Sequence, residues 1–432
     1  MRPVRIEGVT RLPATLRALQ YRNFQLFFGG QLISLIGTWM QNLAQAWLVY
    51  RLTGSMVLLG GISFCSQIPI FLLSPIGGIV ADQYSRHRVV IATQTASMVL
   101  ALALAALTLS HTVHIWHIFV LSALLGSVNA FDVPARQSFI VDMVARADLM
   151  NAIALNSSMF NASRVVGPAI AGILVAVIGE GWCFFANGVS YIAVIVGLLL
   201  MRVERHQAVA VRGSPLENII EGFRFVINNR AIHALLILLG IASVTGMPFT
   251  VLMPVFADRI LHGGPKALGW LTGCAGVGAL AAALLLASRQ TLKGLGGWIA
   301  TSSTAFGAGL IVFALSRAFW FSAVVLVPVG FALMLQMGSS NTLIQSMVPD
   351  YLRGRVMSVY SMMIMGMAPF GGLLAGLVAD RLGAPATVAI GGVICLAAAG
   401  IFWTQLPQIR VHARRMISAQ QAAAAAEQLA AE

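Results

Sequence analysis

Twelve long apolar stretches constrain the fold of this sequence more than any other feature. Each has about 20 residues or more, the length that an α-helix needs to cross a bilayer. Of the 432 residues, 58% are hydrophobic and only 9% are charged, whereas a soluble domain carries roughly 25% charged residues. We therefore predict an all-α polytopic membrane protein with twelve transmembrane helices. The expected spans are residues 24–50, 56–80, 89–110, 116–141, 152–178, 183–202, 231–257, 267–288, 297–316, 320–347, 354–379 and 386–406.

The basic residues are distributed unevenly between the two sides of these spans. Of the 27 Lys and Arg residues, 20 fall on the side of the N-terminus and five on the opposite side, while Arg136 and Arg164 fall within spans. The positive-inside rule places both termini in the cytoplasm, in a bacterial cytoplasmic (inner) membrane. The net charge of +13 thus reports orientation, and no nucleic-acid partner is expected.

One long connection divides the chain into six spans and six spans. It contains Ser214-Pro215-Leu216-Glu217, the pattern of a helix N-terminus, followed by apolar residues at helical spacing. We interpret it as an amphipathic helix lying on the membrane face or against the helix bundle. The expected segments are 1–22 (cytoplasmic), 23–202 (first six-helix bundle), 203–230 (linker), 231–406 (second bundle) and 407–432 (cytoplasmic tail).

The two halves resemble each other in sequence. At an offset of 204 residues, Met143-Val144 matches Met347-Val348, and four glycines of the first half match four of the second. Two parallel six-helix repeats in one chain are typical of a secondary transporter. The fold class that we expect is therefore two pseudo-symmetric six-helix bundles.

A short motif lies at the cytoplasmic turn between the second and third spans. It resembles the major facilitator superfamily signature G-x-x-x-D-R-x-G-R, although Gln83 and Ser85 replace its inner Arg and Gly. The resemblance implies a latch that holds one of two access states, and a plain positively charged loop is the alternative. The residues of this gating motif are Gly78, Asp82, Arg86 and Arg88.

A second motif, Gly167-Pro168 with Gly172 in the fifth span, resembles the antiporter motif of exporters in that superfamily. Close packing of small residues is the alternative explanation. The segments 30–41 and 131–137 resemble the enterobactin-exporter and macrolide-efflux branch. This resemblance implies export of a drug, siderophore or amphipathic metabolite by alternating access, with protons as the coupling ion.

A polar stripe runs along the first span, at steps of three and four residues, so its members share one helix face. Such a face points toward the bundle interior, where it forms interhelical hydrogen bonds or lines a substrate cavity. Polar residues on spans five and ten and the methionine-rich span eleven are similar candidates. The expected substrate-binding residues are Gln31, Ser34, Thr38, Gln41, Gln45, Asn161, Arg164, Gln336, Asn341 and Met362.

Few ionisable residues lie within the spans. Asp132 and Arg136 are four residues apart on the fourth span and are expected to pair. They are the proton-coupling candidates, and a purely structural pair is the alternative. Arg164 is expected to hold an anionic group of the substrate, to pair with Asp132, or to bind backbone carbonyls. Since the first span carries no carboxylate, proton coupling rests on the resemblance.

These features predict a secondary exporter of a small molecule, with protons and membrane lipid as its other partners and a monomeric state. No H-E-x-x-H, no G-x-S-x-G and no paired intramembrane Asp residues occur in the sequence, so we expect neither an enzyme nor a bound cofactor. The run His111, His114 and His117 has metal-ligand spacing, but its place at a span end beside Trp116 favours interfacial residues, and no metal is expected. Two alternatives remain: a lipid or lysolipid flippase of the same fold, and a non-transporting membrane receptor or scaffold.

Overall fold

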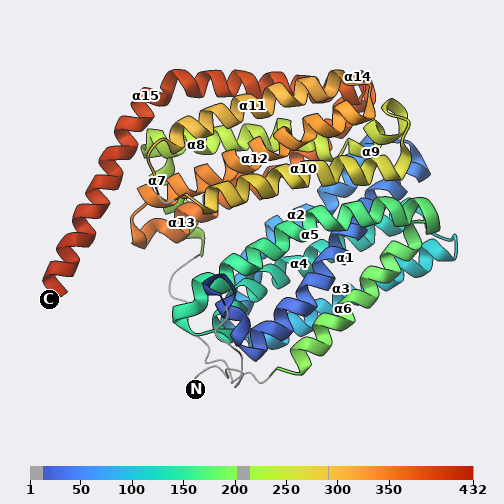
Figure 1. Cartoon of the computed structure of the whole chain (residues 1–432), viewed down its shortest axis with the longest axis horizontal. Coiled ribbons are helices and arrows are strands. Elements are labelled where there is room, and N and C mark those ends of the chain that lie inside the picture. Colours follow the sequence, from blue (N-terminus) through green and yellow to red (C-terminus); the bar gives the residue numbers. More distant parts are fainter. Residues whose placement is uncertain (1–12, 202–214, 290, 432) are drawn as a thin grey trace. The chain divides into compact units, whose positions relative to one another are not determined.

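The computed structural model describes residues 13–201, 215–289 and 291–431 (Figure 1). These residues form helices joined by short turns, and the described ranges contain no strand. The prediction of an all-α membrane fold is confirmed. Ser214, the first residue of the expected helix-starting pattern in the linker, lies outside the described residues.

The first half forms six long helices. Gly54 ends the first of them in the left-handed conformation (φ 63°), and the Ser55 side chain then accepts a hydrogen bond from the Leu58 amide to start the next. The helices are α1 (Arg22–Thr53), α2 (Met56–Gln83), α3 (Arg86–Leu109), α4 (Ile115–Met143), α5 (Leu149–Ile178) and α6 (Glu180–Leu199), with short 3₁₀ segments η1 (Ala14–Gln20) and η2 (Arg146–Asp148).

The second half is less regular, because its first and fifth spans are broken by π-helical turns. The first is built from α8 (Arg230–Ile241), η3 (Ala242–Gly246), η4 (Met247–Thr250), α9 (Met253–Val255) and η5 (Phe256–Ile260). The fifth is built from α13 (Asp350–Ser361), η6 (Met362–Gly366) and α14 (Ala368–Leu382). The other helices are α7 (Pro215–Asn228), α10 (Gly264–Ala287), α11 (Leu295–Leu315), α12 (Phe319–Met347) and α15 (Ala384–Ala431).

Within the described residues, eleven helical segments are long and apolar enough to cross a membrane. The first expected span corresponds to α1, which has 32 residues but is not among the eleven. Its length suffices for a crossing, and its polar stripe lowers its hydropathy. The same stripe that marks α1 as a candidate for function therefore weakens its signal as a membrane span.

Residue contacts group the chain into two compact units. Unit 1 comprises Met1–Arg212 and Met253–Gly273, and unit 2 comprises Gly213–Leu252 and Cys274–Glu432. The segment boundaries expected from the sequence stay a prediction.

Close backbone contact holds the helices of unit 1 together. A Cβ added to Gly30 of α1 would lie 2.9 Å from the Cα of Val194 in α6, so only glycine permits this approach. Nearer the start of α1, Phe24 and Phe27 form a buried apolar cluster with Phe139. The contacts between α1 and α6, and between α2 and α4, position the buried polar residues of unit 1.

In unit 2, α11 packs against α12 and α15, and the amphipathic helix α7 packs on α13. Arg355 of α13 forms an ion pair with Glu221 of α7, and a Cβ on Gly222 would lie 2.6 Å from the Arg355 carbonyl. One face of α7 thus lies against the bundle through Val226, while Ile220 and Ile227 remain exposed.

Candidate transport site

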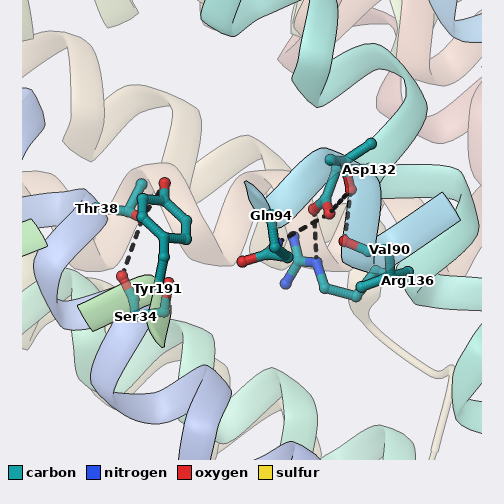
Figure 2. Close-up of polar contacts among 8 residues, drawn as sticks. Ser34, Thr38, Val90, Gln94, Asp132, Arg136 and Tyr191 are labelled. Atoms are coloured by element: carbon teal, nitrogen blue, oxygen red, sulfur yellow. Dashed lines mark hydrogen bonds and ion pairs between the residues drawn. The ribbon is translucent and has the colours of Figure 1, made fainter. Parts of the chain in front are cut away.

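Asp132 is the centre of a buried polar cluster in unit 1, and its side chain accepts hydrogen bonds at both oxygens (Figure 2). Its Oδ1 accepts from Thr93 Oγ1 (2.8 Å) and Gln94 Nε2 (2.9 Å) of α3. Its Oδ2 lies 3.1 Å from Nε of Arg136, one helical turn away. The expected ion pair therefore forms, and the two partners from α3 were not anticipated.

The local backbone around this pair depends on a proline. Pro134 lies inside α4 and has no N–H to offer the carbonyl of Ala130. Gly77 of α2 packs directly against that carbonyl, where any side chain would clash. The close fit of α2 on α4 therefore lies beside the segment that carries Asp132.

The polar stripe of α1 faces the interior of unit 1 and bonds to neighbouring helices. Gln41 accepts a hydrogen bond from Asn187 Nδ2 (2.7 Å), and Gln45 donates to Ser122 Oγ (2.8 Å). The Thr38 hydroxyl donates to the Ser34 carbonyl (2.9 Å) and lies 3.4 Å from the hydroxyl of Tyr191 (Figure 2). The contacts to Asn187, Ser122 and Tyr191 are the interhelical bonds that one of the two interpretations requires.

Gln31, the remaining member of the stripe, is also buried, and its Nε2 has no hydrogen-bond partner. No contact of the described residues tests whether the stripe also lines a substrate cavity. Its substrate role stays a prediction.

Arg164 lies on α5 with its guanidinium 5.8 Å from the ring centroid of Trp39 in α1. Phe160, one turn earlier, meets the same indole edge-on at a centroid distance of 5.6 Å. Asn161 donates to the Ser157 carbonyl of its own helix. Among the residues that the structure describes, no carboxylate lies within ion-pair distance of Arg164. The expected alternative of a pair with Asp132 does not form.

The antiporter motif is a place of close backbone approach. A Cβ on Gly167 would lie 2.6 Å from Cβ of Trp39 and 2.8 Å from the Ile36 carbonyl. A Cβ on Gly172 would lie 2.8 Å from the Cα of Gly269, which also belongs to unit 1. With Pro168 inside the helix, the motif lets α5 touch two other segments at backbone distance.

Arg86 of the gating motif contacts the end of a neighbouring helix. Arg86, at the first position of α3, lies 3.2 Å from Asp142 and donates to the Ser138 carbonyl (3.3 Å), both at the end of α4. Asp82 is not its partner. A guanidinium at a helix C-terminus bonds the terminal carbonyls and favours the negative end of the dipole, so Arg86 joins α3 to α4.

The candidates in unit 2 are neutral. Gln336 is only 1% exposed, and its Oε1 has no hydrogen-bond partner. Beside it lie Ser303, Cys395 and apolar side chains, with no room for a water molecule between them. Asn341 accepts a hydrogen bond from Gln345 (2.8 Å), and Met362 begins the π-helical turn η6.

Long apolar helices with buried polar groups, arranged in two units, are features of the major facilitator fold. Solved structures share this fold. A peptide transporter, POT, has a TM-score of 0.72 at 13% identity and covers 93% of this chain and 99% of its own. The nucleoside transporter NupG has a TM-score of 0.67 at 15% identity, with 91% and 99% covered.

Residues 14–431 match the family described as transmembrane secretion effector, and the chain belongs to this family. The Staphyloferrin A transporter of Staphylococcus aureus is 30% identical over 381 residues, which cover 87% of this chain and 94% of that protein. The multidrug efflux pump Tap of Mycolicibacterium fortuitum is 27% identical, with 81% and 88% covered. Macrolide efflux protein A of Streptococcus pyogenes is 24% identical, with 88% and 96% covered.

These findings confirm the resemblance to the exporter branch of the major facilitator superfamily. The protein is a multi-pass membrane transporter and not an enzyme, because its family and its relatives are transporters.

Proposed function

We propose that the protein exports a small amphipathic compound from the cytoplasm by alternating access, coupled to proton entry. The relatives named above as a siderophore transporter and as efflux pumps support a drug, siderophore or metabolite as cargo. The proposal includes a bacterial cytoplasmic membrane, both termini in the cytoplasm and a monomeric state. The uneven distribution of basic residues supports this orientation.

The observation that carries the proton coupling is the arrangement around Asp132. Of the carboxylates in the described residues, it lies deepest within a helix, eleven residues before the end of α4. Arg136 occupies Oδ2, so a proton on that oxygen takes the place of the guanidinium. Protonation and the ion pair then exclude each other.

Hydrogen-bond acceptors are available near the neutral, protonated form of Asp132. A protonated carboxyl becomes a hydrogen-bond donor. Rotation of the Gln94 amide exchanges its Nε2 for its Oε1, which is buried without a partner and then accepts from Asp132. Thr93 Oγ1 has the Val90 carbonyl at 3.0 Å as a second acceptor when Oδ1 no longer draws its proton. The side chains around Asp132 thus support both protonation states, as a group that carries a proton requires.

Release of Arg136 provides the link between the proton and helix movement. A guanidinium in a buried site without its carboxylate is unfavourable by about 3–5 kcal/mol, so it moves to another acceptor and shifts α4. The contact between Arg86 and Asp142 at the end of the same helix supports the proposed latch formed by the gating motif, with Asp142 as an additional member.

Substrate is proposed to bind near the middle of the spans, with candidate residues in both halves. The candidates in the first half are Asn161, Arg164 and the α1 stripe, and those in the second half are Gln336, Asn341 and Met362. Their support is their polar or adaptable character at membrane depth.

The test is uptake into everted membrane vesicles across a panel of drugs and siderophores, with and without an imposed pH gradient. Asp132→Asn keeps the shape of the side chain and one acceptor oxygen, but it removes the proton site and the charge that pairs with Arg136. We expect gradient-driven uptake to fall to background while exchange of labelled for unlabelled compound continues. Asp380→Asn, the same change at an exposed position of α14, is the matched control and is expected to retain uptake.

Two results would contradict the proposal. Uptake by the wild-type protein that ignores the pH gradient removes the proton coupling. Full gradient-driven uptake by Asp132→Asn removes Asp132 from the mechanism.

A further inference from the structure

We infer that Arg164, seated on the ring of Trp39, binds a carboxylate group of the transported compound. This inference rests on the proposed function, since it treats the ligand as cargo. It assigns a chemical class, a small carboxylate with an adjoining apolar part, to a site in unit 1.

The first argument is depth. Arg164 lies 15 residues after the first residue of α5 and 14 before the last, which is about 21 Å from either end at 1.5 Å per residue. Arg164 is therefore close to the middle of the bilayer, where a charged side chain is costly and marks a site of function.

The second argument is charge. Asp132 already has Arg136 as its partner, and both oxygens of Asp132 accept hydrogen bonds. The other carboxylates of α1–α6 lie at helix ends, where Glu180 pairs with Arg51 and Asp142 with Arg86. The interior of these helices thus holds one positive charge that no described carboxylate balances, and an anionic ligand supplies the missing charge.

The third argument is access. Arg164 is only partly buried, and none of its nitrogen atoms is among the buried polar atoms without a partner. No hydrogen bond from the described residues occupies its N–H groups, so they remain reachable. At 5.8 Å from the ring centroid of Trp39, the guanidinium is within cation–π range without being covered by the ring. Its edge therefore stays free, and that edge matches the two oxygens of a carboxylate.

The fourth argument is how the site is held. Gly167 permits the backbone of α5 to lie against Trp39, which fixes the indole beneath the guanidinium. Phe160 meets the same indole and is 42% exposed. The ring of Phe160 therefore offers an apolar surface next to the cation, which suits a compound that carries a flat apolar part beside its carboxylate.

The test compares two probes of nearly equal shape, 2-naphthoate and the neutral 2-naphthamide, by equilibrium dialysis against the purified full-length protein. A charge-assisted bidentate hydrogen bond predicts that the wild-type protein binds the acid about tenfold more tightly than the amide. Arg164→Gln should lower the affinity for the acid to the affinity for the amide. Arg164→Lys should retain part of the preference for the acid. Arg381→Gln, an exposed position on α14, should change nothing.

Equal affinity of the wild-type protein for both probes would overturn the inference, and so would a preference for the acid that survives Arg164→Gln. If Arg164→Gln does not fold, Trp39→Leu provides a second variant, and its loss of the preference supports the inference. Vesicle uptake separates this result from the proposed function. Acid-selective binding through Arg164, with no gradient-driven uptake of any compound, keeps the binding site and rejects the exporter.

Discussion

The helices α4 and α12 occupy the same place in the two halves and carry opposite kinds of polar group. Both have 29 residues, and the offset of 204 residues maps Asp132 to Gln336 and Arg136 to Ser340. In α4 the two side chains form a buried ion pair. In α12 the Gln336 Oε1 and the Ser340 Oγ are buried without partners.

The neighbouring helices α3 and α11 repeat this difference. An offset of 209 residues aligns their first residues and maps Thr93 to Ser302 and Gln94 to Ser303. Thr93 and Gln94 donate across to Asp132, whereas Ser302 and Ser303 donate to the Ile299 carbonyl of their own helix. One framework thus surrounds an ionisable group in the first half and a neutral one in the second.

The two halves also differ in backbone regularity, and here the second half is the less regular one. The helix α5 is continuous, whereas its counterpart is interrupted by the π-helical turn η6. The Ser243 hydroxyl of η3 donates to the Ile364 carbonyl of η6 (2.7 Å), so the two π-helical turns of unit 2 contact each other. Such turns often mark functional positions in helices. We infer that the first half carries the proton chemistry and that the second half contributes shape.

The largest expected effect comes from breaking the ion pair. Arg136→Gln leaves Asp132 as an unpaired buried charge and should lower the free energy of unfolding by about 3–5 kcal/mol. A thiol-reactive fluorophore can measure this, because Cys183 in unit 1 and Cys395 in unit 2 are free and only 0% and 4% exposed. In variants that keep one cysteine, each reports unfolding of its own unit.

The controls follow from the same comparison. The double variant Asp132→Asn/Arg136→Gln removes both charges and should recover much of the lost stability, while Ser340→Ala in unit 2 should have little effect. Equal losses from Arg136→Gln and the double variant would show that the charge on Asp132 is not what destabilises the protein.

A smaller effect is expected from the hydroxyl that supports the pair. Thr93→Val keeps the shape but removes a hydrogen bond to a carboxylate, worth about 1.5–3 kcal/mol, whereas Ser302→Ala removes a bond to a neutral carbonyl, worth about 0.5–1.5 kcal/mol. The thermal unfolding midpoints, read at Cys183 and Cys395 respectively, measure both. If Ser302→Ala is the more harmful variant, the proposed difference between the halves is wrong.

The smallest effect should come from Gln336. Because its Oε1 is buried without a partner, Gln336→Leu removes an unsatisfied group and should leave the stability unchanged or raise it by about 1 kcal/mol. The matched variant Gln94→Leu removes a donor to Asp132 and should lower the stability. A clear loss from Gln336→Leu would reveal a bound partner for this amide.

The sequence predicts well what depends on spacing along one helix. Apolar length indicates the spans, and the four-residue spacing predicts the pair of Asp132 and Arg136, which the structure contains. Hydropathy does not reveal π-helical turns, because one extra residue per turn leaves an apolar segment apolar. The breaks at η3 and η6 were therefore not anticipated.

What depends on contacts between helices was also missed. Thr93, Gln94 and Trp39 reach their partners only because α3 and α1 are rotated in a particular way about their axes. That rotation follows from the glycine contacts of the whole bundle. The motif around Asp82 likewise does not say which carboxylate Arg86 binds, and the structure shows it to be Asp142 at the end of α4.

The last helix has a practical consequence. Its 48 residues correspond to about 72 Å at 1.5 Å per residue, more than twice the hydrocarbon thickness of about 30 Å. In Figure 1 the end of α15 extends away from the other helices of unit 2. Figure 1 also shows that α15 bends, and Pro407 lies inside it. Energy transfer from a membrane dye to a fluorescent protein fused after this helix would therefore measure whether its end rises from the lipid surface or runs along it.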